Sequence, residues 1–215
     1  MKINIRHEEP KDYMQVEEMT REAFWNLYCP GCNEHLIVHN MRKHPDFIPE
    51  LSFVIEKDNQ IIGSIFYTHS KVLSKDGTEH KTITFGPVSI LPKYHRKGFG
   101  SAIIEHSIEE AKRLGYSAII IGGYRYHYET YGFTGAKKYG ISLPDGNFYT
   151  GIMALPLYPG ALDGINGSVF FSDAMDPDER ALADFDKLFP AKEKHIEESQ
   201  HKFEKAISEI DVKDY

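Results

Sequence analysis

The first half of the chain contains runs rich in apolar residues, bounded by turn residues, that read as strands. This pattern covers residues 3–6, 51–56, 61–72 and 83–91, with turns at 58–60 and 74–80. Residues 83–91 are rich in β-branched and apolar side chains, and Pro92 ends the run because proline cannot donate a ladder hydrogen bond. We expect the last three of these strands to form an antiparallel meander.

Apolar residues at helical spacing predict three helices in the same part of the chain. They cover residues 10–28, 33–43 and a segment from Ser101 to Gly115. In the last one, Ile103, Ile104 and Ile108 fall on one face. Gly115 then provides a C-terminal stop.

Further elements are predicted beyond Gly115. Residues 116–121 form a buried strand, a short helix with several tyrosines follows around 126–133, and 137–143 pairs with 148–157 across a turn at 144–147. Beyond Pro159 the composition shifts, with a helix expected at 176–188 and a charged tail from Pro190. Four residues of this tail form one apolar stripe at helical spacing: Ile196, Phe203, Ile207 and Ile210. We expect this stripe either to pack on the body or to form the contact of a homodimer.

The junction between the 83–91 strand and the third helix indicates a phosphate site. Gly98 and Gly100 allow a tight turn that brings backbone N–H groups close to a ligand. The helix N-terminus adds partial positive charge, and Arg96 and Lys97 strengthen the attraction. A P-loop is excluded because Gly-x-x-x-x-Gly-Lys-Ser/Thr is absent, and a Rossmann turn because Ile103 replaces its third glycine.

The order Val88, Pro92, Tyr94, Gly98-Phe99-Gly100 resembles the acetyl-CoA turn of the GNAT N-acetyltransferase superfamily, whose signature is Gln/Arg-x-x-Gly-x-Gly/Ala. His95 stands where the family usually has Gln or Arg. Tyr128 lies five residues before the phenylalanine of a Gly-Phe pair, as does the tyrosine that protonates the CoA thiolate in many GNAT enzymes. The family often has Asn or Asp where this chain has Tyr124. The resemblance covers about residues 3–157.

The resemblance implies an α/β (α+β) fold with a mixed, mostly antiparallel central sheet, flanked by helices and splayed at the acetyl-CoA site. It divides the chain into an N-acetyltransferase domain, residues 1–159, and a C-terminal extension, residues 160–215. Acetyl-CoA is then the cosubstrate, Tyr128 the general acid, and a free amine attacks the thioester directly. The resemblance implies these cofactor-binding residues: Val88, Ser89, Ile90, His95, Arg96, Lys97, Gly98, Phe99, Gly100 and Ser101.

Composition is that of an ordinary globular enzyme. The 215 residues are 41% hydrophobic, and no apolar run is long enough to span a membrane. The segment from Met1 to Ile5 reads as a strand rather than a signal sequence, so a cytoplasmic location is expected. A net charge of −7 argues against nonspecific nucleic-acid binding. The expected partner is a small-molecule or peptide amine.

A cluster of cysteines and histidines lies between the first two helices. Cys29, Cys32, His35 and His39 have the donor types of a zinc site, but they are too close together for the usual paired ligand arms, and no metal is predicted. A redox pair lacks a thioredoxin-like context. In the family this region borders the acceptor pocket, so Glu34, His35 and His39 are predicted substrate contacts.

Two questions stay open at this level. The general base is one of several candidates: His69, Glu79, His80 or the Glu34 and His35 pair. Some proteins with this fold bind acyl-CoA without transferring the acyl group, so a sensor or interaction module is the alternative function.

Overall fold

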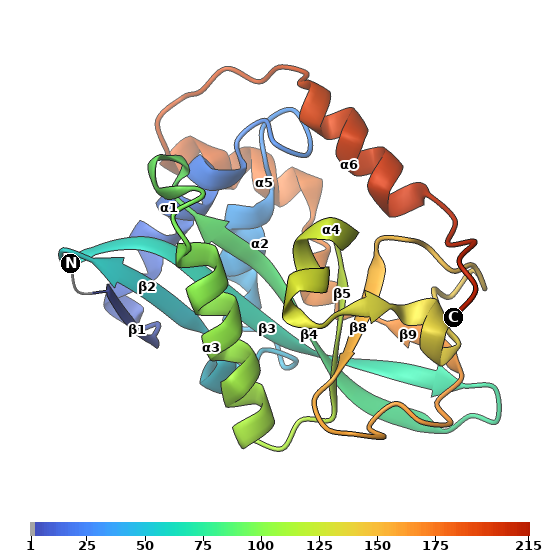
Figure 1. Cartoon of the computed structure of the whole chain (residues 1–215). Coiled ribbons are helices and arrows are strands. Elements are labelled where there is room, and N and C mark those ends of the chain that lie inside the picture. Colours follow the sequence, from blue (N-terminus) through green and yellow to red (C-terminus); the bar gives the residue numbers. More distant parts are fainter. Residues whose placement is uncertain (1–2) are drawn as a thin grey trace.

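Three of the predicted strands are neighbours and run antiparallel at the centre of the sheet (Figure 1). The structure is a computed structural model that describes residues 3–215, apart from the side chain of Glu179. β2 (Phe53–Lys57), β3 (Gln60–Ser74) and β4 (Glu79–Ile90) pair in sequence order, and β1 (Ile3–His7) adds outside β2. The predicted meander is confirmed. Met1 and Lys2 lie outside the described residues.

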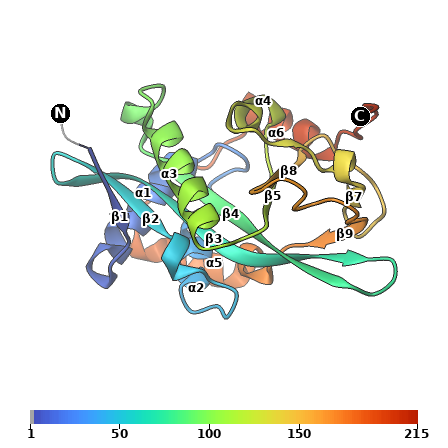
Figure 2. The same cartoon turned by 60° about the horizontal axis from the view of Figure 1, so that its bottom comes forward.

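Successive residues of these strands pack on two helical layers, one on each face of the sheet (Figure 2). α3 (Phe99–Arg113) lies on one face, and α1 (Tyr13–Phe24) and α2 (Glu34–Met41) lie on the other. Ile55 and Tyr67 belong to the cluster that includes the isoleucines of α3, whereas Val54 and Phe66 pack with α1 and α2. This period of two makes the sheet the middle layer of the molecule.

The sheet splays after β4. β5 (Ala118–Gly122) is parallel to β4, and in the described chain the two strands pair only at Ile83 and Ile119. On its other side β5 pairs antiparallel with β8 (Ile152–Pro156), which also holds β6 (Thr134–Gly135). The carboxyl half of β4 therefore has β3 on one side and no described strand on the other.

One predicted strand pair is wrong. Residues 137–143 do not pair with 148–157: Ala136–Tyr139 form a 3-10 turn, and β7 (Ile141–Ser142) pairs in parallel with β9 (Gly167–Phe170). β9 also pairs with the end of β3. Gly167 permits this approach, because a Cβ there would lie 2.0 Å from the carbonyl oxygen of Leu73. A distant segment thus takes the position expected for a local hairpin.

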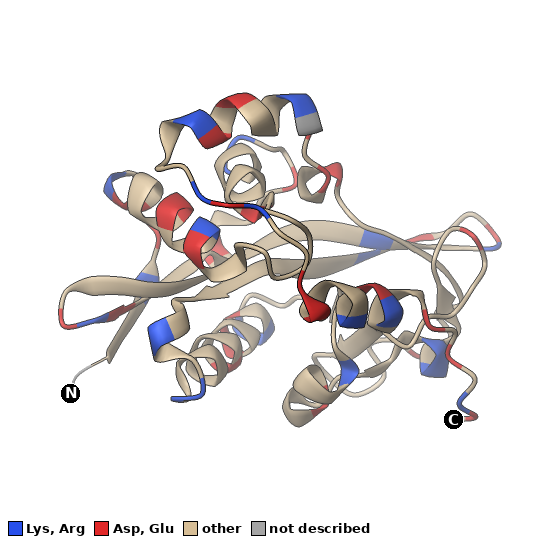
Figure 3. Ribbon diagram, turned by 90° about the horizontal axis from the view of Figure 1, so that it is seen from above, with Lys and Arg blue, Asp and Glu red and all other residues tan. Residues whose placement is uncertain are grey.

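The last fifty residues wrap back over the body. α5 (Glu179–Phe185) and α6 (Glu198–Ser208) follow β9, and α4 (Arg125–Tyr128) lies beneath the path of the C-terminal segment (Figure 1). Polar contacts hold this segment to α1 and the loop after it, including Arg21 Nε to Asp186 Oδ1 at 2.9 Å and Trp25 Nε1 to the Glu193 carbonyl at 2.9 Å. Acidic and basic residues are interspersed along the helices (Figure 3). No helix in residues 3–215 is long and apolar enough to cross a membrane.

Candidate functional site

The turn before α3 presents a row of unused backbone donors. Gly98 caps the helix at φ 83°, and Arg96 is also left-handed at φ 57°. Among the described residues, none accepts a hydrogen bond from the N–H groups of residues 96–101. Alternating left- and right-handed residues followed by a helix N-terminus create a concavity for an anion. The geometry and the free N–H groups of this turn suit an anion such as phosphate.

The side chains of this turn have separate tasks. Lys97 Nζ donates to the Lys93 carbonyl at 2.8 Å, which closes the turn, while the Arg96 side chain is exposed. Phe99 packs edge-on against Tyr94 and anchors the first helical turn in the core. Gly100 lies beside the end of β4, where an added Cβ would be 3.8 Å from Ile90 Cγ1. The groups that residues 96–101 can offer to an anion are therefore mainly backbone N–H groups.

The open edge of β4 offers backbone groups next to this turn. The Leu91 N–H donates to the Ile62 carbonyl at 2.8 Å, so bonded and non-bonded pairs alternate backward from there. Val88 and Ile90 accordingly turn their N–H and C=O groups away from β3, toward the opening beside β5. Ser89 instead faces β3 with its backbone, and its hydroxyl lies 3.1 Å from Thr20 Oγ1 beneath α1.

His95 uses its side chain within the protein. Its Nε2 lies 2.7 Å from the carbonyl oxygen of Ile90, and because a carbonyl only accepts, Nε2 carries the proton. The imidazole thereby closes the end of the β4 edge. At the signature position usually filled by Gln or Arg, this chain has a residue that shapes the turn.

Tyr128 lies at the end of α4 with its ring against the core. Phe85 and Phe133 pack on it with ring centroids 5.7 and 5.9 Å away. Gly123 makes room for the ring, because a Cβ at that position would be 2.7 Å from Tyr128 Cε2. Burial raises the pKa of Tyr128 to about 12, so the phenol stays protonated at neutral pH.

The tyrosine segment and the phosphate turn are in contact. Tyr131, one turn after Tyr128, places its hydroxyl 3.0 Å from Ser101 Oγ at the start of α3. The Phe85 ring of β4 packs against the Tyr128 ring. The two motifs that the sequence separates by about thirty residues therefore form one site at the splayed end of β4.

A cluster of aromatic rings extends from Tyr128 toward the loop after α1. It contains Tyr28, Tyr124, Tyr126 and Phe203, and the Tyr28 and Phe203 rings stack with centroids 3.9 Å apart. Burial raises the pKa of Tyr28, and the nearby Tyr128 and Tyr124 hydroxyls add to the increase. No sequence pattern assigns Tyr28 to this site, because neither periodicity nor any motif marks it.

The Glu34 carboxyl lies beside this cluster, and no described side chain pairs with it. Burial raises its pKa to about 7, opposed only by hydrogen bonds from its own N–H and that of Asn33, whose nitrogen is 3.1 Å from Oε2. Its carboxylate also contributes to the raised pKa of Tyr28, which places the two groups near each other. Close to neutral pH this carboxyl can gain and release a proton.

The histidines predicted beside Glu34 are engaged elsewhere. His35 is fully buried, its Nε2 lies 3.1 Å from Asp186 Oδ1, and its Nδ1 lies 3.5 Å from Cys32 Sγ. Burial lowers the pKa of His35 to about 4, so its ring is neutral. His39 Nδ1 lies 3.0 Å from Glu17 Oε1 between α1 and α2. Cys32 and His35 thus contact each other, but His39 pairs with Glu17 and Cys29 is exposed at the surface, so the four side chains considered as zinc ligands do not converge.

The remaining base candidates lie on the distal part of the β3 and β4 hairpin. Glu79 pairs with Lys71, and His80 Nε2 lies 2.9 Å from Ser74 Oγ. His69 is exposed and packs near Tyr116. His69 pairs with Ile83, and Glu79 and His80 lie further along the hairpin, away from Phe85. Of the candidate bases, Glu34 is therefore the one next to the aromatic cluster.

A turn with free backbone donors, an open strand edge and a protonated tyrosine meet at a splayed mixed sheet, an arrangement that can accept a phosphorylated ligand beside a proton donor. The chain belongs to the acetyltransferase (GNAT) family, whose profile matches residues 19–131. Comparison with curated protein sequences gave no significant match.

Solved structures share the fold. A GNAT family N-acetyltransferase (YhbS) from Escherichia coli, in complex with CoA, is 21% identical with a TM-score of 0.72 over 82% of this chain and 93% of that one. A GNAT family acetyltransferase from Brucella melitensis, in complex with acetyl-CoA, is 24% identical with a TM-score of 0.65 over 81% and 99%. The ribosomal-protein-S18-alanine N-acetyltransferase from Escherichia coli is 20% identical with a TM-score of 0.52 over 73% and 94%.

Proposed function

We propose that the protein transfers an acetyl group from acetyl-CoA to a primary amine by direct attack within a ternary complex. The observation that carries this proposal is the pair of titratable groups beside Tyr28. Burial keeps Tyr128 protonated, with a pKa of about 12, and brings Glu34 to about 7. Two groups whose environments separate their proton affinities in this way suit an acid and a base.

The cofactor side has the donors that CoA requires. The free N–H groups of residues 96–101 would hold the pyrophosphate at the N-terminus of α3. The outward backbone groups of Val88 and the outward N–H of Ile90 would bond the pantetheine amides as an added strand, while the Ile90 carbonyl stays bonded to His95. Acetyl-CoA supplies a thioester whose sulfur departs when the acetyl group is transferred.

The acceptor side supplies proton transfer. Glu34, directly or through water, removes a proton from the substrate ammonium, and the free amine then forms a C–N bond to the acetyl carbon as the C–S bond breaks. The N–H near Val88 would stabilise charge on the carbonyl oxygen. Tyr128 donates its proton to the departing sulfur, and the acylated nitrogen loses its excess proton to solvent. Exchange with solvent then returns a proton to the Tyr128 phenolate and removes one from Glu34. Placing amine and thioester together provides most of the acceleration.

The test is release of CoA thiol from acetyl-CoA in the presence of a panel of primary amines. We expect amine-dependent release together with an acetylated amine detected by mass spectrometry. Binding of acetyl-CoA without release for any amine would support the sensor alternative and refute the transferase.

A further inference from the structure

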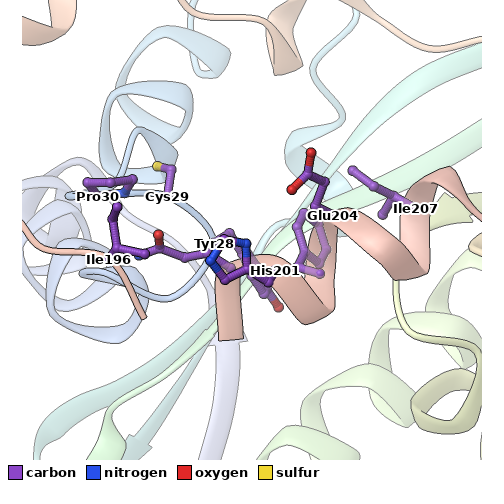
Figure 4. A pocket seen from close by; sticks show the side chains of 9 residues that line it. Tyr28, Cys29, Pro30, Ile196, His201, Glu204 and Ile207 are labelled. Carbon is purple, nitrogen blue, oxygen red and sulfur yellow. The ribbon is translucent and has the colours of Figure 1, made fainter. Parts of the chain in front are cut away.

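A groove lies between α6, which follows the matched family region, and the loop after α1, which is within that region (Figure 4). Its volume is about 430 Å³. The loop after α1 contributes Tyr28, Cys29 and Pro30 to the lining, and the C-terminal segment contributes apolar residues that include Ile196, Phe203 and Ile207. The groove is therefore built largely by the C-terminal segment.

The lining of this groove is mainly apolar although it faces solvent. Ile196 is 70% exposed and Ile207 is 39% exposed. Gln200, the buried polar residue of the lining, uses its amide nitrogen within the protein, at 3.0 Å from the Asn26 carbonyl and 3.1 Å from the His195 carbonyl. Exposed apolar side chains that line one concave surface indicate a ligand with an apolar part.

Two aromatic rings join this groove to the reacting groups. Tyr28 and Phe203 line the groove and stack on each other, and Phe203 also contacts Tyr124 edge-on at 5.7 Å. The hydroxyl of Tyr28 is close enough to Tyr128 and Glu34 for both to affect its ionisation. Tyr28 and Phe203 therefore lie between the groove and α4, the helix that carries Tyr128.

We propose that the acceptor is a primary amine with a single positive charge on an aliphatic chain, and that this chain lies in the groove while the ammonium faces Glu34. This assignment rests on the proposed acetyl transfer. The groove would place the alkyl carbons against Ile196, Ile207 and Phe203, with the polar rim residues His201 and Glu204 in water.

A second charge at the far end of the acceptor opposes this binding. An ammonium that lies within the apolar lining loses its hydration, and it regains a charged partner only if the acceptor is long enough to reach the Glu204 carboxylate at the rim. Each methylene that leaves water for an apolar surface improves binding about fourfold. The groove therefore distinguishes a monoamine from a diamine of the same length.

The first experiment uses the unchanged protein and measures thiol release with propylamine, butylamine, pentylamine, hexylamine and 1,6-diaminohexane. We expect kcat/KM to rise about fourfold for each added CH2 until the groove is filled. Hexylamine should exceed 1,6-diaminohexane at least tenfold. Equal rates across the series, or faster reaction of the diamine, would overturn the groove assignment while leaving acetyl transfer intact. Silence with every amine, including lysine and spermidine, would instead overturn the transferase itself.

The second experiment compares Ile207→Asp with Val212→Asp. Both replace an exposed apolar residue with an acid, but Val212, at 82% exposure, does not line the groove. We expect Ile207→Asp to raise the KM for hexylamine about tenfold and leave the KM for acetyl-CoA and for propylamine within twofold. Val212→Asp should change none of them. Equal effects of the two variants, or no effect of Ile207→Asp, would refute the proposed location of the alkyl chain.

Discussion

Replacing Glu34 with glutamine tests the base and has opposite effects on activity and stability. The carboxyl has a pKa near 7 because burial disfavours its charge, and the described side chains include no cation paired with it. Glutamine keeps the size of the side chain but cannot accept a proton. We expect kcat to fall about 10²- to 10⁴-fold, the usual contribution of a positioned base.

The sign of the stability effect follows from the raised pKa. The folded protein holds this proton more tightly than the unfolded chain, so the free energy of unfolding decreases as pH rises from about 4.5 to 7. Ionising the buried carboxyl at pH 8 costs about 3 kcal/mol at full effect. Because the side chain is only half-buried, screening reduces this to about 1–2 kcal/mol. Glu34→Gln should therefore be more stable than the parent at pH 8, by about 2–4 °C in Tm per kcal/mol, and equal to it near pH 4.5.

The assays are thiol release from pH 6 to 9 and thermal unfolding at pH 4.5 and 8. In the parent, kcat should rise as pH increases through about 7, because the base acts in its ionised form, and this step should be absent in Glu34→Gln. Glu18→Gln is the matched control, since Glu18 is exposed on α1 and should change neither quantity. Full kcat with an unchanged pH profile in Glu34→Gln would remove Glu34 from the mechanism.

Further substitutions separate the acid from the phosphate turn. Tyr128→Phe should lower kcat about 10²- to 10⁴-fold with the Kd for acetyl-CoA within twofold by calorimetry; unchanged kcat would rule out its role as acid. Gly98→Ala should raise the Kd for acetyl-CoA at least tenfold, because the left-handed turn presents the N–H groups. Gly77→Ala is its control: both glycines have φ above 80° and no atom within 4 Å of an added Cβ, so chemical denaturation should show similar destabilisation, of about 1 kcal/mol, in both. Weaker acetyl-CoA binding in both variants would indicate general destabilisation.

Local patterns predicted the parts of the site that depend on local structure. The apolar runs bounded by turn residues predicted β2 to β4. Apolar residues at helical spacing, together with Gly98 and Gly100, predicted α3 and the turn before it. The pairing of 137–143 was wrong because β9, thirty residues away, offers Gly167 where the backbone of β3 approaches closely. The residues around 137–143 carry no signal that a strand so distant in the chain pairs with them.

Burial decided what the sequence left open around Glu34. Glu34 and His35 are neighbours in the chain and were equal candidates, yet the fold buries His35 against Asp186, which lies 151 residues away. That contact depends on α5 and the following turn folding back on α1. Tyr28 and Phe203 likewise meet only through the C-terminal segment. Roles set by contacts of this range emerge only from the folded chain.

The open edge of β4 has a consequence for solution behaviour. A strand with outward N–H and C=O groups is a template for pairing with a strand of another chain. A ligand lying along Val88 and Ile90 would occupy that template, so acetyl-CoA should suppress aggregation as well as raise Tm by mass action. His95, by covering the Ile90 carbonyl, already shortens the exposed edge in the free protein. By covering part of the strand edge, His95 can thus reduce self-association of the protein when no ligand lies along β4.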